Sequence, residues 1–138
     1  MNTATTTITA VTTHPQASLL RTAIRLDATG VALMGLGIAA VAGPFARQTG
    51  FTSAWAYGLA AAFVLYGVVG NWLAGRVDIR PIGTGLSLFN FVGAVGQIAL
   101  VPAGVLALTG SGNAALVFGG LWALFFGVLQ LIGLRRLA

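Results

Sequence analysis

The sequence predicts an all-α membrane protein, a four-helix bundle of antiparallel, up-and-down spans. The chain is 57% hydrophobic and only 7% charged, which lies outside the usual range for soluble globular domains. Three windows carry no charged residue, namely 28–46, 48–75 and 81–134. Because a span needs about 20 apolar residues, these windows hold one, one and two spans, and 138 residues support a single domain.

Residues 1–20 form a Thr-rich tail that is predicted to lie outside the transmembrane domain of residues 21–138. Its β-branched residues favour extended backbone, and His14-Pro15 interrupts that backbone. Alone, such a tail is expected to be disordered. Two alternatives would order it: docking on a partner as an added strand, or packing on its own bundle.

The first two spans are predicted at about residues 24–42 and 53–73. Gly43-Pro44 is expected to end the first span, because proline cannot continue the backbone hydrogen-bond ladder. The segment around Arg47 is typical of a short piece of chain lying in the headgroup region.

The third and fourth spans are predicted at about residues 82–108 and 114–134. A polar turn at 75–81 precedes the third span, and an uncharged turn at 109–113 follows it. We expect Pro102 to kink the third span, because it leaves the carbonyl one turn earlier without its usual partner.

The arginines predict the orientation of the bundle. On this topology only Arg47 lies on the side opposite the termini, so the positive-inside rule places both termini in the cytoplasm of a multi-pass protein of the plasma or inner membrane. The arginines form no basic stripe, which argues against nucleic-acid binding. Trp122 falls within a span, away from the expected aromatic belts. Six arginines share the side of the termini: Arg21, Arg25, Arg76, Arg80, Arg135 and Arg136.

Each span carries one polar side chain at a comparable predicted depth near the cytoplasmic end: Asp27, Asn71, Asn90 and Gln130. Gln97 shares a helical face with Asn90 and is expected near the bilayer midplane. Its expected partner is a carbonyl released by proline, another helix of the bundle, or a second protein.

This polar cluster has two interpretations. In the functional one, a cavity open to the cytoplasm lets Asp27 bind a proton, a cation or a polar headgroup. In the structural one, the amides bond between helices and Asp27 pairs with an arginine. The candidate salt-bridge partners are Arg76, Arg80, Arg135 and Arg136.

The residue types that are missing narrow the chemistry. The chain has no cysteine, lysine or glutamate, and its single histidine, His14, lies in the tail. These gaps argue against thiolate, Schiff-base, two-histidine haem and paired-carboxylate sites within the bundle. We therefore expect no enzymatic activity, no catalytic or metal site and no cofactor.

Several short motifs carry a resemblance. They are Arg25-Leu26-Asp27-Ala28, Ala42-Gly43-Pro44, Phe89-Asn90-Phe91, and Gln130 before Gly133-Leu134-Arg135-Arg136. With them, the chain after residue 20 resembles a group of small bacterial four-span integral membrane proteins. The resemblance implies the fold and topology and supplies no catalytic residue.

The sequence favours a non-enzymatic accessory subunit that packs in the lipid bilayer against a larger membrane protein complex or against copies of itself. The alternative is a small transporter or channel, or a lipid-binding protein, with a polar cavity around Asp27. Small exporters that insert in two orientations have little arginine bias, so the six-to-one bias argues against that symmetry.

Overall fold

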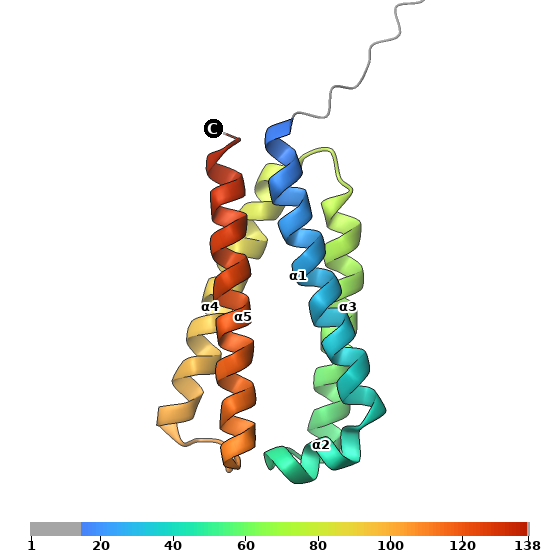
Figure 1. Cartoon of the computed structure of the whole chain (residues 1–138), viewed down its shortest axis with the longest axis vertical. Helices are drawn as coiled ribbons and strands as arrows, with labels where there is room; N and C mark the ends of the chain where they lie inside the picture. Colours follow the sequence, from blue (N-terminus) through green and yellow to red (C-terminus); the bar gives the residue numbers. More distant parts are fainter. Residues whose placement is uncertain (1–14, 138) are drawn as a thin grey trace, which may run out of the picture.

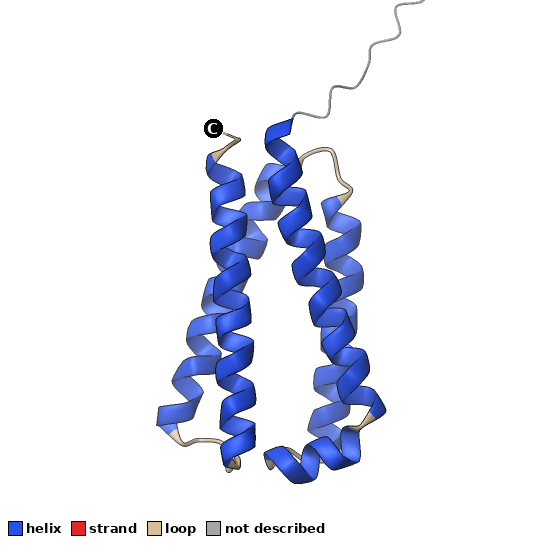
Figure 2. Cartoon of the chain, viewed as in Figure 1, coloured by secondary structure: helices blue, strands red, loops and turns tan. Residues whose placement is uncertain are grey.

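The computed structural model describes residues 15–137, and this part of the chain is helical without strands (Figure 2). The predicted all-α four-helix bundle is confirmed, with one short helix, α2 (Ala42–Thr49), added to the four long ones (Figure 1). The long helices alternate in direction along the bundle. They are α1 (Pro15–Ala40), α3 (Ser53–Ala74), α4 (Ile79–Ala103) and α5 (Gly110–Arg135).

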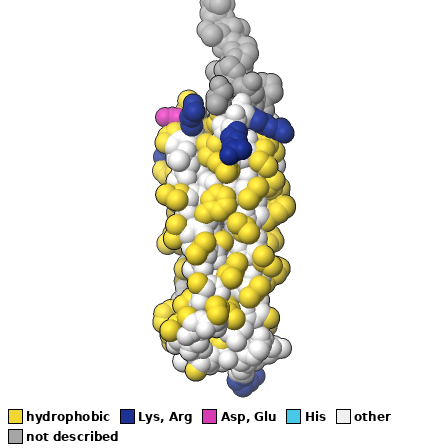
Figure 3. Space-filling model, turned by 90° about the vertical axis from the view of Figure 1, so that its left-hand side faces the viewer, with side chains coloured by type: hydrophobic (Ala, Val, Ile, Leu, Met, Phe, Trp, Pro, Cys, Tyr) yellow, Lys and Arg dark blue, Asp and Glu magenta, His cyan; other side chains and the backbone are white. Residues whose placement is uncertain are grey.

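Each long helix is long and apolar enough to cross a bilayer. Only 17–28% of the residues in their most apolar windows are buried inside the bundle, so most of the apolar surface points outward. Figure 3 shows hydrophobic side chains along the shaft, with basic side chains gathered at one end and a single basic cluster at the other. These are the features of a multi-pass membrane protein.

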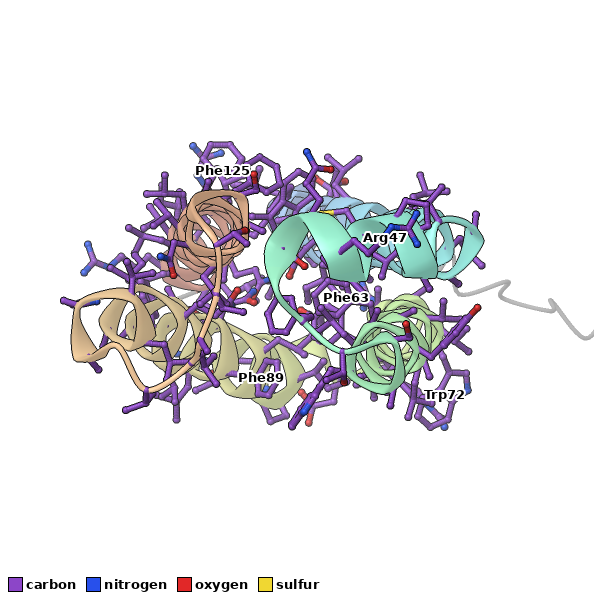
Figure 4. The ribbon with its side chains drawn as sticks, turned by 90° about the horizontal axis from the view of Figure 1, so that it is seen from below. Arg47, Phe63, Trp72, Phe89 and Phe125 are labelled. Carbon is purple, nitrogen blue, oxygen red and sulfur yellow. The ribbon has the colours of Figure 1, made fainter. Side chains whose placement is uncertain are left out.

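The helices form two closely packed pairs. α1 packs along α3 and α4 packs along α5, while the two pairs meet chiefly between α1 and α5. Seen from the α2 end, the pairs lie side by side (Figure 4). They are joined at this end by Thr109, whose hydroxyl donates to the Gln48 carbonyl over 2.6 Å and whose N–H donates to the Thr49 carbonyl over 3.1 Å.

Glycines set the close approach within each pair. A Cβ on Gly67 of α3 would collide with the Ala32 side chain and lie 2.6 Å from the Ala28 carbonyl oxygen of α1. A Cβ on Gly120 of α5 would lie 2.6 Å from the Ile98 side chain of α4. Because lipid tails are as apolar as the helices, such close backbone contact is a main source of helix association in a membrane.

The helix α1 begins earlier than expected. Residues 15–20, predicted to belong to the tail, form its first turns, with Pro15 at the first helical position. Leu20 is fully buried and packs with Ile24 and Ile79 in an apolar cluster at the arginine-bearing end. Burial of Leu20 in this cluster lowers the free energy of the helical form, which explains why the helix includes residues 15–20. The predictions for residues 1–14 lie outside the described residues.

The first span also ends differently. α1 stops at Ala40, and Gly43-Pro44 lies inside the first turn of α2, where the missing N–H of a proline would have no intrahelical acceptor. α2 lies across the end of the bundle opposite the C-terminus (Figure 1), and Figure 4 shows Arg47 on it. Proline therefore starts a new helix here instead of ending the previous one.

The turn between the last two spans is shifted toward the N-terminus. α4 ends at Ala103, so Pro102 sits in its last turn and does not kink a longer helix. Gly104 then adopts the left-handed conformation, with φ of 62°, that commonly ends a helix. α5 begins at Gly110, because the Thr109 hydroxyl caps it by accepting the N–H of Gly112 over 3.2 Å.

The packing of α1 on α3 gives a first prediction. Gly67→Val should lower the free energy of unfolding by roughly 2 kcal/mol or more, because its side chain would separate the two backbones. Gly58→Val is the matched control on the same helix, since a Cβ at Gly58 meets nothing within 4 Å. Denaturation of both variants in mixed micelles, followed by circular dichroism, measures the difference. Equal stability of the two variants would contradict the glycine contact.

Candidate functional site

The centre of the bundle is a buried carboxylate. Asp27 lies at the middle of α1 and is 1% exposed. Its Oδ2 accepts hydrogen bonds from Tyr66 Oη at 2.7 Å, Asn90 Nδ2 at 2.8 Å and Gln130 Nε2 at 3.2 Å. Its Oδ1 accepts one from Trp122 Nε1 at 3.0 Å. Each of the other three long helices therefore donates at least one bond to α1.

The indole of Trp122 reaches Asp27 because the facing position on α1 has no side chain. A Cβ on Gly30 would overlap the Trp122 ring. Phe126, one turn further along α5, packs on the same indole with ring centroids 5.0 Å apart. The indole is therefore held between a glycine and an aromatic ring, with its only polar atom directed at the carboxylate.

The phenol of Tyr66 is fixed by an aromatic contact with the neighbouring helix. Its ring stacks on Phe89 of α4, with centroids 5.8 Å apart and an angle of 20° between the planes. α3 and α4 touch little elsewhere. The stack and the Asp27 network thus bring α3 of one helix pair into contact with α4 of the other.

Within residues 15–137, Asp27 has no arginine partner, in contrast to the expected salt bridge to Arg76, Arg80, Arg135 or Arg136. Those arginines lie near the ends of the helices, whereas Asp27 lies at mid-helix. Arg76 instead covers the Trp72 ring, with its Cζ 3.7 Å from the ring centroid.

Two of the predicted polar residues, Asn90 and Gln130, meet Asp27, and both are buried. Asn71 does not, because it is exposed on the α1–α3 surface and donates to Thr29 Oγ1 over 3.2 Å. Two members of the cluster also lie further from a helix end than expected. Since α1 starts at Pro15, Asp27 and Asn90 both lie near the middle of their helices rather than near one end.

Gln97 lies apart from the cluster. It is about 9 Å from the C-terminal end of α4, measured along the helix, so it does not occupy the middle of the span. Its Oε1 rests on Gly119 of α5, where a Cβ would overlap it. The side chain is half-buried and forms no hydrogen bond within residues 15–137, including to the Ile98 carbonyl freed by Pro102.

Sequence reasoning missed Tyr66 and Trp122 as donors to Asp27. Both count as apolar in composition and periodicity, which hides their single polar atoms. The available signal was position: a tryptophan within a span, away from the aromatic belts, and a tyrosine whose hydroxyl needs a partner in an apolar environment.

The site is enclosed by the bundle. Two shallow apolar grooves mark the outer surface, one of about 500 Å³ along α3 with Ala39 of α1 at its edge, and one of about 300 Å³ along α4 beside Leu124. Neither groove is lined by Asp27 or by any of its four donors.

The donor set defines what Asp27 can do. A carboxylate offers about two lone-pair directions on each oxygen, and here three hydrogen bonds converge on Oδ2 and one on Oδ1. Because N–H and O–H groups direct positive charge at the carboxylate, the arrangement suits an anion and opposes a bound cation. One polar atom remains without a partner in the described bundle, the buried Oε1 of Gln130.

Comparison with protein-family models, curated proteins and solved structures found no match to the chain. The resemblance to small bacterial four-span membrane proteins therefore stays a prediction.

The network gives a second prediction. Asp27→Leu removes the common acceptor and leaves four donors unpaired, so we expect a loss of at least about 3 kcal/mol in the free energy of unfolding. Asp78→Leu is the matched control, because Asp78 is the other acid of the chain, is exposed and makes no side-chain capping bond. Unfolding in mixed micelles measures both. A similar small effect of the two substitutions would contradict a structural role for the network.

Proposed function

We propose that this multi-pass membrane protein is a non-enzymatic accessory subunit that packs against a larger membrane protein. Its place is the plasma or inner membrane, with both termini in the cytoplasm. The apolar helices contact lipid over part of their surface and a partner over the rest.

The side chains available for chemistry support a role without catalysis. The bundle draws on a sequence without cysteine, lysine or glutamate. Its buried acid, Asp27, already accepts four hydrogen bonds and lines neither surface groove. A general acid or base must reach a substrate, and neither groove is lined by this carboxylate.

The observation that carries the proposal is Gln97. This amide lies within an apolar span and has no hydrogen-bond partner inside the described bundle. An amide left unpaired in lipid costs on the order of 2 kcal/mol or more. A polar group on a partner helix would satisfy it, as amides commonly do between membrane helices. The outward-facing apolar surface of each span provides the area for such a partner.

The transporter or lipid-cavity alternative has less support. It requires an opening beside Asp27, whereas that side chain is 1% exposed and surrounded by donors from three helices.

The partner contact gives a third prediction. After extraction in mild detergent, the tagged protein should co-purify with a larger membrane protein in fixed stoichiometry, and Gln97→Leu should reduce its recovery about tenfold, as expected when a buried amide pair is lost. Gln48→Leu, on an exposed position of α2, is the control and should leave recovery unchanged. Recovery of copies of this chain alone would replace the larger partner by a homo-oligomer, and a stable monomer would contradict both.

The orientation gives a fourth prediction. Because the chain has no cysteine, single cysteines can be placed without a background. Val77, in the α3–α4 turn, and Val105, in the α4–α5 turn, are 95% and 68% exposed. A membrane-impermeant maleimide added to intact cells should label Val105→Cys and spare Val77→Cys until the cells are opened. The reverse pattern would place the termini outside the cytoplasm.

A further inference from the structure

Asp27 differs from most buried carboxylates in having no cation beside it within residues 15–137. Arg25, two residues earlier on α1, is exposed, and among the described residues Tyr66 on α3 is the only titratable group that is hydrogen-bonded to the carboxylate. The facing groups of α4 and α5 are neutral, namely Asn90, Trp122 and Gln130.

The charged groups of other elements are also remote from Asp27. α2, which carries Arg47, lies across the end of the bundle opposite the C-terminus (Figure 1). Burying a charge without a counter-ion is expensive, and such a group readily exchanges its charge for a proton.

We propose that Asp27 is a proton-binding site in which the Gln130 amide pairs with both charge states of the carboxyl group. The proposal is independent of the accessory role, since it concerns the interior of this chain alone.

The anionic state is the arrangement described above. Gln130 Nε2 donates to Asp27 Oδ2 over 3.2 Å, while Gln130 Oε1 remains buried without a partner. The amide therefore has an acceptor, Oε1, that is available for a further hydrogen bond. Gln130 is 0% exposed, so water at the bundle surface does not reach that oxygen.

In the protonated state, Gln130 Oε1 serves as the acceptor. A proton taken from water forms an O–H bond on Oδ2, and the neutral carboxyl group then needs an acceptor. Rotation of the Gln130 amide by about 180° turns Oε1 toward this O–H group. The Gln130 amide contacts Oδ2, so the O–H group that its oxygen can accept lies on Oδ2, while the indole of Trp122 is only a donor and stays on Oδ1. One proton is taken up and no covalent bond is broken. The hydrogen bond from Gln130 Nε2 to Oδ2 is exchanged for one from the carboxyl O–H group to Gln130 Oε1.

Proton uptake changes the strength of the hydrogen bonds between Asp27 and the other helices. Hydrogen bonds to a charged acceptor are roughly twice as strong as those to a neutral one. The bonds from Tyr66 of α3 and Asn90 of α4 therefore weaken when Asp27 is neutral, while Gln130 keeps α5 attached. The site links proton concentration to the contact between the two helix pairs.

Trp122 provides a reporter for this step, and a fifth prediction. In the full chain in lipid nanodiscs, Trp55→Phe and Trp72→Phe remove the two exposed tryptophans and leave the indole that contacts Asp27. We expect Trp122 emission to change with pH in a single transition, because the negative charge beside the indole is lost. Asp27→Asn should abolish the change, and Asp78→Asn should leave it intact. Infrared difference spectra of the parent protein should show a carboxyl C=O band that appears as the pH is lowered, and this band should be missing in Asp27→Asn.

Two variants separate the amide exchange from a simple carboxylate. Tyr66→Phe keeps the ring that stacks on Phe89 and removes a donor to the anion, so the midpoint should rise by about one pH unit or more. Gln130→Leu removes a partner from both charge states, so its midpoint should move by less than half of that shift.

Three results would overturn the proposal. The first is an emission change that persists in Asp27→Asn, and the second is no change in the parent protein. The third is a rise in Gln130→Leu as large as that in Tyr66→Phe, which would mean that the amide serves the anion alone. The infrared band tests the first two results without the tryptophan substitutions, so that test does not depend on the stability of those variants.

Discussion

Four hydrogen bonds to one carboxylate connect all four long helices of this protein. In a membrane, apolar side chains gain little by leaving lipid for one another, so close packing and hydrogen bonds decide which helices associate. Glycine contacts explain the two pairs, α1 with α3 and α4 with α5. Asp27 then joins the pairs, because it sits on α1 and accepts bonds from α3, α4 and α5.

The same constraint explains features that look unrelated along the chain. Trp122 lies at mid-helix because its indole N–H reaches Asp27, and Gly30 is small because the indole needs the space. The arginines of residues 15–137 have no part in the network. Arg21 instead donates to the Ala74 carbonyl over 2.5 Å and thereby caps α3. The arginines and the Asp27 network are thus separate sets of interactions.

The predicted depth of the polar residues in each span indicated part of the site. Asn90 and Gln130 were expected to share a level with Asp27, and both contact it. Asn71 was expected at that level too, and Gln97 nearer the midplane. Contact also requires that a residue face the bundle axis, which depends on how each helix is rotated against its neighbours. Asn71 faces the outer surface and pairs with Thr29, and Gln97 rests on Gly119 toward the other end of the bundle.

The sequence by itself determined the four apolar helices and the segregation of arginines, because span length and charge are properties of contiguous residues. It placed the helix ends less well, since the burial of Leu20 extends α1 and the Thr109 cap starts α5 early. Only the tertiary structure decided the helix pairing and the partners of Asp27. Gln130 lies 103 residues away along the chain, and no local pattern fixes the distance between two such side chains.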